Sequence, residues 1–162
     1  ALATFRSVKR RMQVRGTVNG VTVIDDFAHH PTAVRETLLA LREKYAEGRL
    51  VAVFEPRSAS SRLAVFQEEY VEALRQADYV VVAQVFERDK GSKYGRLLDA
   101  DELVRDVAAN GRTPAFCLDG ADAIVSHLSP QLRAGDTVAV MSNGGFGGIH
   151  DKLLAALKTN SI

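Results

Sequence analysis

The chain has 162 residues, 46% of them apolar, and 21 basic and 20 acidic side chains that leave a net charge of +1. This length suits one domain with a core of its own. The near-neutral charge gives no electrostatic reason to expect nucleic acid or a membrane surface as a partner. The single cysteine, Cys117, cannot form an internal disulfide, and no membrane-spanning apolar stretch or signal-peptide pattern occurs. We therefore expect a cytoplasmic protein.

Strand-like and helix-like patterns alternate along the chain. Asn19-Gly20 favours the two positive φ angles of a tight turn, and the apolar segments around it predict an antiparallel hairpin of 12–18 and 21–24. Apolar runs predict strands at 50–54, 79–83, 114–118 and 137–141, and the run at 50–54 is continuous, as in a strand covered on both faces. Helical spacing of apolar residues predicts helices at 31–45, 62–76, 99–109 and 122–128 and a last helix ending near 157.

These elements define the expected fold. Strands that alternate with helices at this spacing favour an α/β class with a doubly wound, mainly parallel sheet, helices on both faces and the antiparallel hairpin at the N-terminus. Gly48 is expected to end the first helix, and a polar loop is expected at 87–96. We expect one domain, 1–162, in which residues 1–6 are linker. In such a sheet, ligands bind beyond the carboxyl ends of the strands.

The first of three polar turns at that edge is DDFAHHP, residues 25–31. His30 falls at the helix N-cap and Pro31 at the first helical position, so the free N–H groups that follow form a modest anion site beside His29. The acids suit ribose hydroxyls or a hydrated cation. The same spacing also fits acids that cap a turn and histidines that bond their own backbone. No third partner has ligand spacing, so no metal site is predicted.

Two further turns are expected beside the first. EPRSASSR (55–62) carries Arg57, whose planar guanidinium suits a carboxylate or phosphate unless it pairs with Glu55 on the surface. SNGGFGGIH (142–150) has four glycines, which let backbone N–H groups approach a ligand closely. This loop follows the last strand rather than the first, so it is not the dinucleotide fingerprint of an oxidoreductase, and the sequence contains no P-loop.

Four ordered motifs give the chain a family resemblance. VKRRM (8–12), DDFAHHPTAV (25–34), FEPRS (54–58) and MSNGGFGGIH (141–150) resemble the carboxy-terminal domain of the Mur ligases, the ATP-dependent enzymes that join amino acids or peptides to UDP-N-acetylmuramic acid. Within the family, the motifs are similar to the member that joins the murein tripeptide L-Ala-γ-D-Glu-meso-diaminopimelate to UDP-N-acetylmuramate in peptidoglycan recycling. The related L-alanine ligase tends to have His-Arg where this chain has Arg57-Ser58.

The resemblance implies a Rossmann-like domain that closes over a site completed by two other domains. Family members bind the UDP-sugar in an amino-terminal domain and ATP with Mg²⁺ mainly in a central domain of the same polypeptide. In this chain Arg11 matches a nucleotide-binding arginine, and Asp26 matches an acid that contacts the ribose. His29 would face the acyl phosphate and is the implied catalytic residue of this domain.

The remaining matched positions are implied to receive the peptide. They are His30, Arg57, Ser58, Ser142, Asn143, Gly144 and Gly145. An arginine and a set of backbone N–H groups suit the several carboxylates of a tripeptide. The peptide amine would attack an acyl phosphate formed with ATP, so this domain alone is expected to fold without turning over.

Two other interpretations are weighed against the ligase. The chain could be a free-standing, non-catalytic module that holds a phosphorylated ligand at its glycine loop. The basic run VKRRM could bind nucleic acid, but no aromatic stacking platform accompanies it, and we expect no nucleic-acid partner. A P-loop and a sugar-binding domain encoded upstream would separate the ligase from the module.

Overall fold

The computed structural model describes residues 10–58, 61–85 and 95–159. The strands in this part of the chain are β1 (Gln13–Val18), β2 (Val21–Asp26), β3 (Leu50–Phe54), β4 (Tyr79–Ala83), β5 (Ala115–Leu118) and β6 (Thr137–Met141). The helices are α1 (Pro31–Lys44), α2 (Gln67–Leu74), α3 (Ala100–Ala108), α4 (Gly120–Leu128) and α5 (Ile149–Thr159), with short 3₁₀ turns η1 (Ala64–Phe66) and η2 (Phe146–Gly148). The expected linker at 1–6 and most of the expected loop at 87–96 lie outside the described residues.

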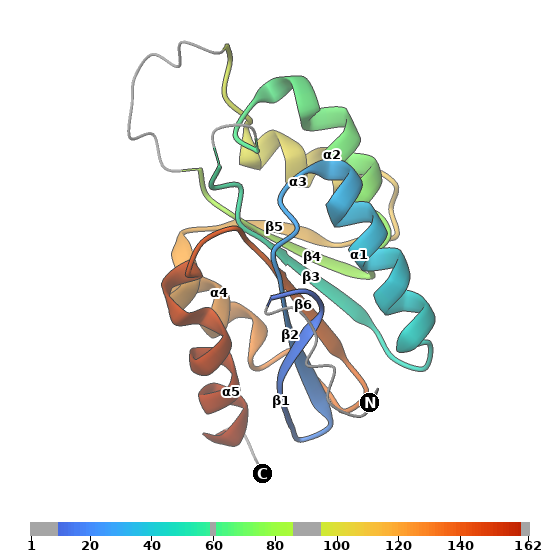
Figure 1. The fold of residues 1–162 in the computed structure, drawn as a ribbon, viewed down its shortest axis with the longest axis vertical. Coiled ribbons are helices and arrows are strands. Elements are labelled where there is room, and N and C mark those ends of the chain that lie inside the picture. The colour runs from blue at the N-terminus through green and yellow to red at the C-terminus, as the bar shows by residue number, and fades with distance from the viewer. Residues whose placement is uncertain (1–9, 59–60, 86–94, 160–162) are drawn as a thin grey trace, which may run out of the picture.

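The strands form one sheet in the order β1-β2-β6-β3-β4-β5 (Figure 1). β1 pairs antiparallel with β2, and the other four pairings are parallel. β3, β4 and β6 are buried along their whole length, which is typical of strands covered on both faces. The expected fold class, a doubly wound and mainly parallel sheet that starts with an antiparallel hairpin, is confirmed.

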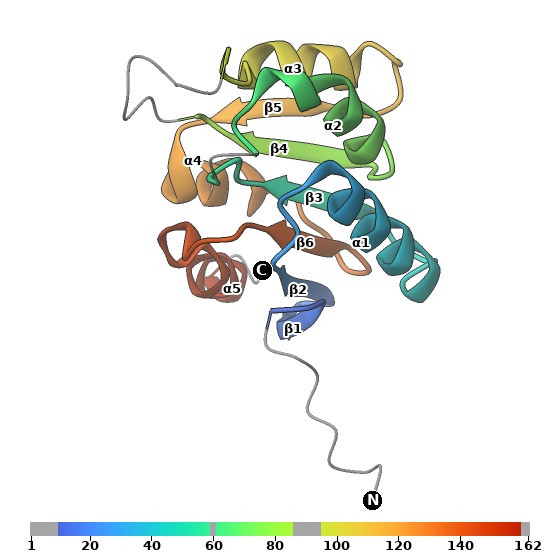
Figure 2. The same cartoon turned by 45° about the horizontal axis from the view of Figure 1, so that its top comes forward.

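Helices cover both faces of the sheet. α1, α2 and α3 lie on one face and α4 and α5 on the other, as Figure 2 shows. Each layer has its own apolar core: Leu38, Leu74 and Leu103 are buried in the first, and Ile124 and Leu153 in the second. None of the described helices is long and apolar enough to cross a bilayer.

The N-terminal hairpin has the expected turn. Asn19 and Gly20 both have positive φ angles, 52° and 76°, as a tight hairpin requires. β2, however, continues two residues beyond the expected end at Ile24 and includes Asp25 and Asp26. Both carboxylates are therefore held in the sheet and buried, at 3% and 6% exposure, instead of lying in a solvated loop.

The helix expected at 62–76 is shorter than predicted. α2 begins only at Gln67, after the 3₁₀ turn η1. The residues before it pair with a distant segment: Ala64 N–H donates to the Arg96 carbonyl at 2.9 Å, and Leu98 N–H donates to the Arg62 carbonyl at 2.7 Å. Between them Leu63 is extended, with φ −90° and ψ 132°, and forms an antiparallel bridge with Leu97, a conformation that a helix cannot share.

Gly48 has a different role from the one expected. α1 ends at Lys44 with Tyr45 as its C-cap, so Gly48 lies beyond the helix end. At Gly48 the backbone instead passes very close to Gly135, in the loop before β6. A Cβ at Gly48 would lie 1.7 Å from the Gly135 carbonyl oxygen. The close approach of two loops, and not a helix cap, requires glycine here.

We expect Gly48→Ala to destabilise the fold. The added methyl forces these two loops apart, and overpacking of this kind costs about 1–3 kcal/mol. Chemical denaturation measures the loss, with Glu47→Ala as the control at an exposed neighbouring position, where a change within about 0.5 kcal/mol is expected. Equal stability of the two variants would contradict the close approach.

Candidate functional site

Three turns meet at the carboxyl edge of the sheet. They follow β2, β3 and β6, which lie side by side because β6 pairs with both others. Ser142 N–H donates to the Asp26 carbonyl at 3.1 Å, and Glu55 N–H donates to the Met141 carbonyl at 3.0 Å. The Ser142 hydroxyl donates to the Glu55 carboxylate at 2.5 Å. These three turns are the acid-imidazole turn (25–31), the arginine turn (55–58) and the glycine turn (142–148). Together they form one continuous surface.

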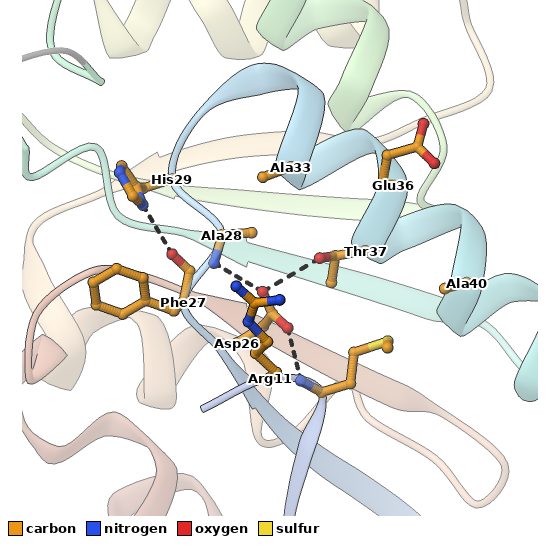
Figure 3. A pocket seen from close by; sticks show the side chains of 10 residues that line it. Arg11, Asp26, Phe27, Ala28, His29, Ala33, Glu36, Thr37 and Ala40 are labelled. Atoms are coloured by element: carbon orange, nitrogen blue, oxygen red, sulfur yellow. Dashed lines mark hydrogen bonds between the residues drawn. The ribbon is translucent and has the colours of Figure 1, made fainter. Parts of the chain in front are cut away.

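A pocket of about 550 Å³ opens beside the first turn (Figure 3). Its walls come from the start of β1, the turn after β2 and one side of α1. It is lined by Arg11, Met12, Asp26, Phe27, Ala28, His29, Ala33, Glu36, Thr37 and Ala40. Arg11, Asp26 and His29, which the resemblance assigned to the nucleotide and the acyl phosphate, all line this pocket.

Asp26 organises the pocket wall. Its Oδ1 accepts hydrogen bonds from Ala28 N–H at 2.8 Å and from the Thr37 hydroxyl at 3.2 Å, and its Oδ2 accepts from Met12 N–H at 2.7 Å. These contacts join β1, the turn and α1 through one buried carboxylate, as the dashed lines in Figure 3 show. The alternative considered from sequence, an acid that caps its own turn, therefore describes part of what Asp26 does.

The contacts of His29 fix its tautomer. Its Nδ1 lies 2.9 Å from the Phe27 carbonyl oxygen. Because a carbonyl oxygen can only accept, Nδ1 carries the proton in this contact, and Nε2 of the neutral ring is left as an acceptor. The buried Tyr70 hydroxyl donates to the His29 carbonyl at 2.5 Å, and burial raises the pKa of Tyr70, so this donor stays protonated. Both bonds hold the imidazole at the rim of the pocket.

The glycine turn lies against the arginine turn. A Cβ at Gly144 would lie 2.5 Å from Cδ of Arg57, so only glycine lets the Arg57 side chain cross this backbone. The Arg57 side chain is 59% exposed and only 4.0 Å from the Glu55 carboxylate, a loose ion pair. Gly144 N–H donates to Ser142 Oγ at 2.9 Å. Arg57, Ser142 and Gly144 are thus brought together, and Asn143 and Gly145 lie in the same turn.

The two other predicted peptide-binding residues lie in the first two turns. His30 is the N-cap of α1, as expected, but makes no side-chain cap bond, and its ring lies edge-on to Phe66 at 4.9 Å. Ser58 makes a turn with Ser61: its hydroxyl donates to Ser61 Oγ at 2.8 Å and accepts from Ser61 N–H at 3.0 Å. These side-chain contacts of His30 and Ser58 are thus with their own neighbourhoods and not with the glycine turn.

A buried ionic cluster below the turns was not predicted. Asp25 lies within 3.5 Å of the side chains of Arg10, Arg15 and His150. Arg10 comes from the segment before β1 and His150 from the start of α5, so the cluster joins distant parts of the chain. Adjacent basic residues in VKRRM carry no sequence signal that separates Arg10 from Arg11. Among the described residues, no group of three His, Cys, Asp or Glu side chains is placed to hold a metal ion.

The environment of His150 favours its neutral form. Its side chain is almost fully buried, and burial is the largest cause that lowers its pKa below the ordinary value of 6.5. Asp25, 3.3 Å from Nε2, acts in the opposite direction, but Arg15 and Arg10 also disfavour a charged imidazole. Because Asp25 is shared with two arginines, its charge is already compensated and does not reverse the effect of burial.

Comparison with known proteins identifies the family. Residues 10–144 match the family model described as "Mur ligase, glutamate ligase domain". The chain belongs to the Mur ligase family. Over 98% of its length it is 40% identical to the UDP-N-acetylmuramate–L-alanyl-gamma-D-glutamyl-meso-2,6-diaminoheptandioate ligase of Haemophilus influenzae. It is 35% identical, over 89% of its length, to the UDP-N-acetylmuramate–L-alanine ligase of Desulfotalea psychrophila.

Solved structures of Mur ligases share the fold. The murein peptide ligase of Psychrobacter arcticus is 36% identical, with a TM-score of 0.79 over 99% of this chain and 32% of that protein. A domain of a putative ligase for the same tripeptide from Haemophilus ducreyi is 39% identical, with a TM-score of 0.69 over 91% of this chain and 99% of that domain. The chain spans 32% and 31% of the two curated relatives. The match to a Mur ligase carboxy-terminal domain confirms the resemblance found in sequence.

We expect His150 to make stability depend on pH. In the unfolded chain His150 binds a proton near its ordinary pKa of 6.5, but the folded state keeps it neutral. The unfolded state therefore binds more protons, and the contribution present above this pKa is lost as the pH falls, by up to about 1.4 kcal/mol per pH unit. Urea unfolding between about pH 7.5 and pH 5 should show a steeper loss than in His150→Gln. Parallel curves would contradict the neutral histidine.

Proposed function

We propose that this chain is the carboxy-terminal domain of a cytoplasmic, three-domain, ATP-dependent ligase that joins L-Ala-γ-D-Glu-meso-diaminopimelate to UDP-N-acetylmuramate. The amino-terminal and central domains of the same polypeptide complete its site. One observation carries the proposal: the pocket that contains Arg11, Asp26 and His29 adjoins the surface that contains Arg57 and the glycine turn. A ligase of this class must bring a nucleotide and a peptide together at one place.

Arg11 and Asp26 are proposed to bind the nucleotide. A carboxylate has about four acceptor positions. Three of those on Asp26 are used by Met12, Ala28 and Thr37, which leaves one on Oδ2 for a ribose hydroxyl. Apolar side chains of the lining, such as Met12 and Ala33, suit a base or a sugar face. ATP, when bound, supplies the phosphoryl group that activates the sugar carboxylate, and Mg²⁺ is proposed to bind mainly in the central domain.

His29 is proposed to act at the acyl phosphate end of the pocket. Its Nδ1 is occupied by the Phe27 carbonyl, so only Nε2 is available to a ligand. As an acceptor, Nε2 suits the amine proton that leaves when the peptide attacks the activated carboxylate. The imidazole also lies edge-on to Phe27, with ring centroids 5.3 Å apart, which restricts its rotation.

The second and third turns are proposed to receive the peptide. The Arg57 guanidinium is exposed and only loosely paired, so it can bind a peptide carboxylate at little cost. Ser142, Asn143, Gly144 and Gly145 line the adjoining turn. His30 and Ser58 lie in the first two turns and are proposed as outer contacts of the same peptide.

An L-alanine ligase is the alternative from the same family. Relatives of that kind match this chain at 35% identity or less among those compared, below the 40% of the tripeptide ligase. A free amino acid has one carboxylate, whereas the tripeptide has several. The exposed Arg57 beside the backbone N–H groups of the glycine turn favours the substrate with more carboxylates. The alternative of a non-catalytic module is disfavoured, because the relatives that match 98% and 99% of this chain are named as ligases.

The intact polypeptide that carries this domain should use the tripeptide. With ATP and UDP-N-acetylmuramate present, we expect ADP release to depend on the tripeptide, with L-alanine at least about tenfold less effective in kcat/KM. Arg57→Ala should raise the KM for the tripeptide about 10- to 100-fold, the loss typical of a charged hydrogen bond. A coupled ADP assay measures both.

Arg112→Ala serves as the matched control, because Arg112 is an exposed arginine at the opposite, amino edge of the sheet. Its KM should stay within about twofold of wild type. A preference for L-alanine would identify the alternative ligase. An unchanged KM in Arg57→Ala would remove this residue from the peptide site.

The isolated chain should fold without turning over. Its two apolar cores are complete on both faces of the sheet, and a related domain from Haemophilus ducreyi was crystallised by itself. The phosphate-binding loop expected of this family is not in the chain. Circular dichroism should show cooperative unfolding, and the ADP assay should give no turnover above background. Ligation by the isolated chain would contradict the division of the site among domains.

A further inference from the structure

Arg10 is bound to the glycine turn through two backbone carbonyls. Its Nη2 donates to the carbonyl oxygens of Ser142 and Gly144, at 2.7 Å each. Its Nε lies 3.4 Å from the buried carboxylate of Asp25, and its guanidinium carbon lies 5.2 Å from the centroid of the Phe27 ring. With these partners on several sides, Arg10 is committed to the protein and is poorly placed to bind a substrate itself.

The two carbonyl contacts fix the direction of two peptide units. In a planar trans peptide, the C=O of one residue and the N–H of the next point in opposite directions. Since the carbonyls of Ser142 and Gly144 point toward Arg10, the N–H groups of Asn143 and Gly145 point away from it. The positive charge at the carbonyl end also polarises both units and strengthens these N–H groups as donors.

Several other N–H groups of this turn already have acceptors. Ser142 N–H donates to the Asp26 carbonyl, Gly144 N–H to Ser142 Oγ, and Gly148 N–H to the Gly145 carbonyl. No acceptor in the described part of the chain lies within hydrogen-bonding distance of the N–H groups of Asn143 and Gly145. The two N–H groups that Arg10 orients are therefore available to a ligand. N–H groups of a turn that point to the same side form an anion-binding concavity.

We infer that Arg10 is a positioning residue that orients the N–H groups of Asn143 and Gly145 as a receptor for a carboxylate. For the identity of the ligand, a carboxylate of the peptide substrate, this inference rests on the proposed function. Arg57, whose side chain crosses Gly144, supplies the positive charge on the ligand side. The peptide then binds to the loosely paired Arg57 and to backbone donors that the partly buried Arg10 holds in place.

A simpler role for Arg10 would be to neutralise the buried Asp25. Arg15 allows the two roles to be separated, because its Nη1 also lies 3.5 Å from Asp25 but its other ion pair is with the exposed Asp151. The Arg10 and Arg15 side chains are similarly exposed, at 30% and 32%. Arg15→Ala removes a comparable ion pair and leaves the glycine turn with its Arg10 contacts.

The intact ligase provides the first test. Arg10→Ala should raise the KM for the tripeptide by about tenfold or more and change the KM for ATP less than about twofold, whereas Arg15→Ala should change neither beyond about twofold. Gly145→Pro should raise the same KM, because proline removes the N–H of residue 145. The φ of Gly145, −77°, suits proline, and a Cβ there meets no atom within 4 Å. Gly145→Pro remains informative even if Arg10→Ala does not fold.

The isolated chain provides a test that does not depend on the reaction. In amide ¹H–¹⁵N spectra, Arg10→Ala should shift or broaden the resonances of Asn143 and Gly145, and Arg15→Ala should not. If Arg10→Ala leaves both amides unchanged, or if Arg10→Ala and Arg15→Ala have the same KM, the inference is overturned. If the wild-type ligase does not use the tripeptide, the proposed function fails, and the amide spectra still decide the role of Arg10.

Discussion

The insertion of β6 between β2 and β3 is the constraint on which the site depends. These strands are far apart in sequence, yet β6 forms parallel hydrogen bonds with both. Their carboxyl ends therefore lie in a row, with the glycine turn between the acid-imidazole turn and the arginine turn. The direct bonds among Asp26, Glu55 and Ser142 follow from this order. Without β6 between β2 and β3, the glycine turn would not join the other two turns.

The two carboxylates at the end of β2 stabilise this edge on opposite faces of the sheet. Asp26 faces the α1 side and binds backbone and hydroxyl donors, so it shapes the pocket. Asp25 faces the other side, where Arg10, Arg15 and His150 surround it. Adjacent residues of a strand point to opposite faces, which lets one dipeptide serve both layers. Substitution of either acid is therefore expected to disturb the backbone as well as any ligand contact.

Much of the fold could be predicted from sequence because its strands are continuous apolar runs and its first hairpin contains Asn19-Gly20. The start of α2 could not be predicted, because residues 62–64 pair with residues 96–98. The local spacing of apolar residues carries no information on such long-range pairing. Three turns at one edge could be expected from parallel strands. The sequence could not show which arginine of VKRRM holds the glycine turn, because Arg10 and Arg11 are adjacent and alike, and only the folded backbone brings Arg10 to Ser142 and Gly144.

The position of Arg10 also has a mechanical consequence. Arg10 precedes the first residue of β1, Gln13; its carbonyl accepts a hydrogen bond from Phe27 N–H at 2.8 Å, and its side chain donates to the turn after β6. One residue thus ties the segment before β1 to the turn after β2 through its backbone and to the turn after β6 through its side chain. A displacement of Arg10 would therefore disturb two edge turns at once.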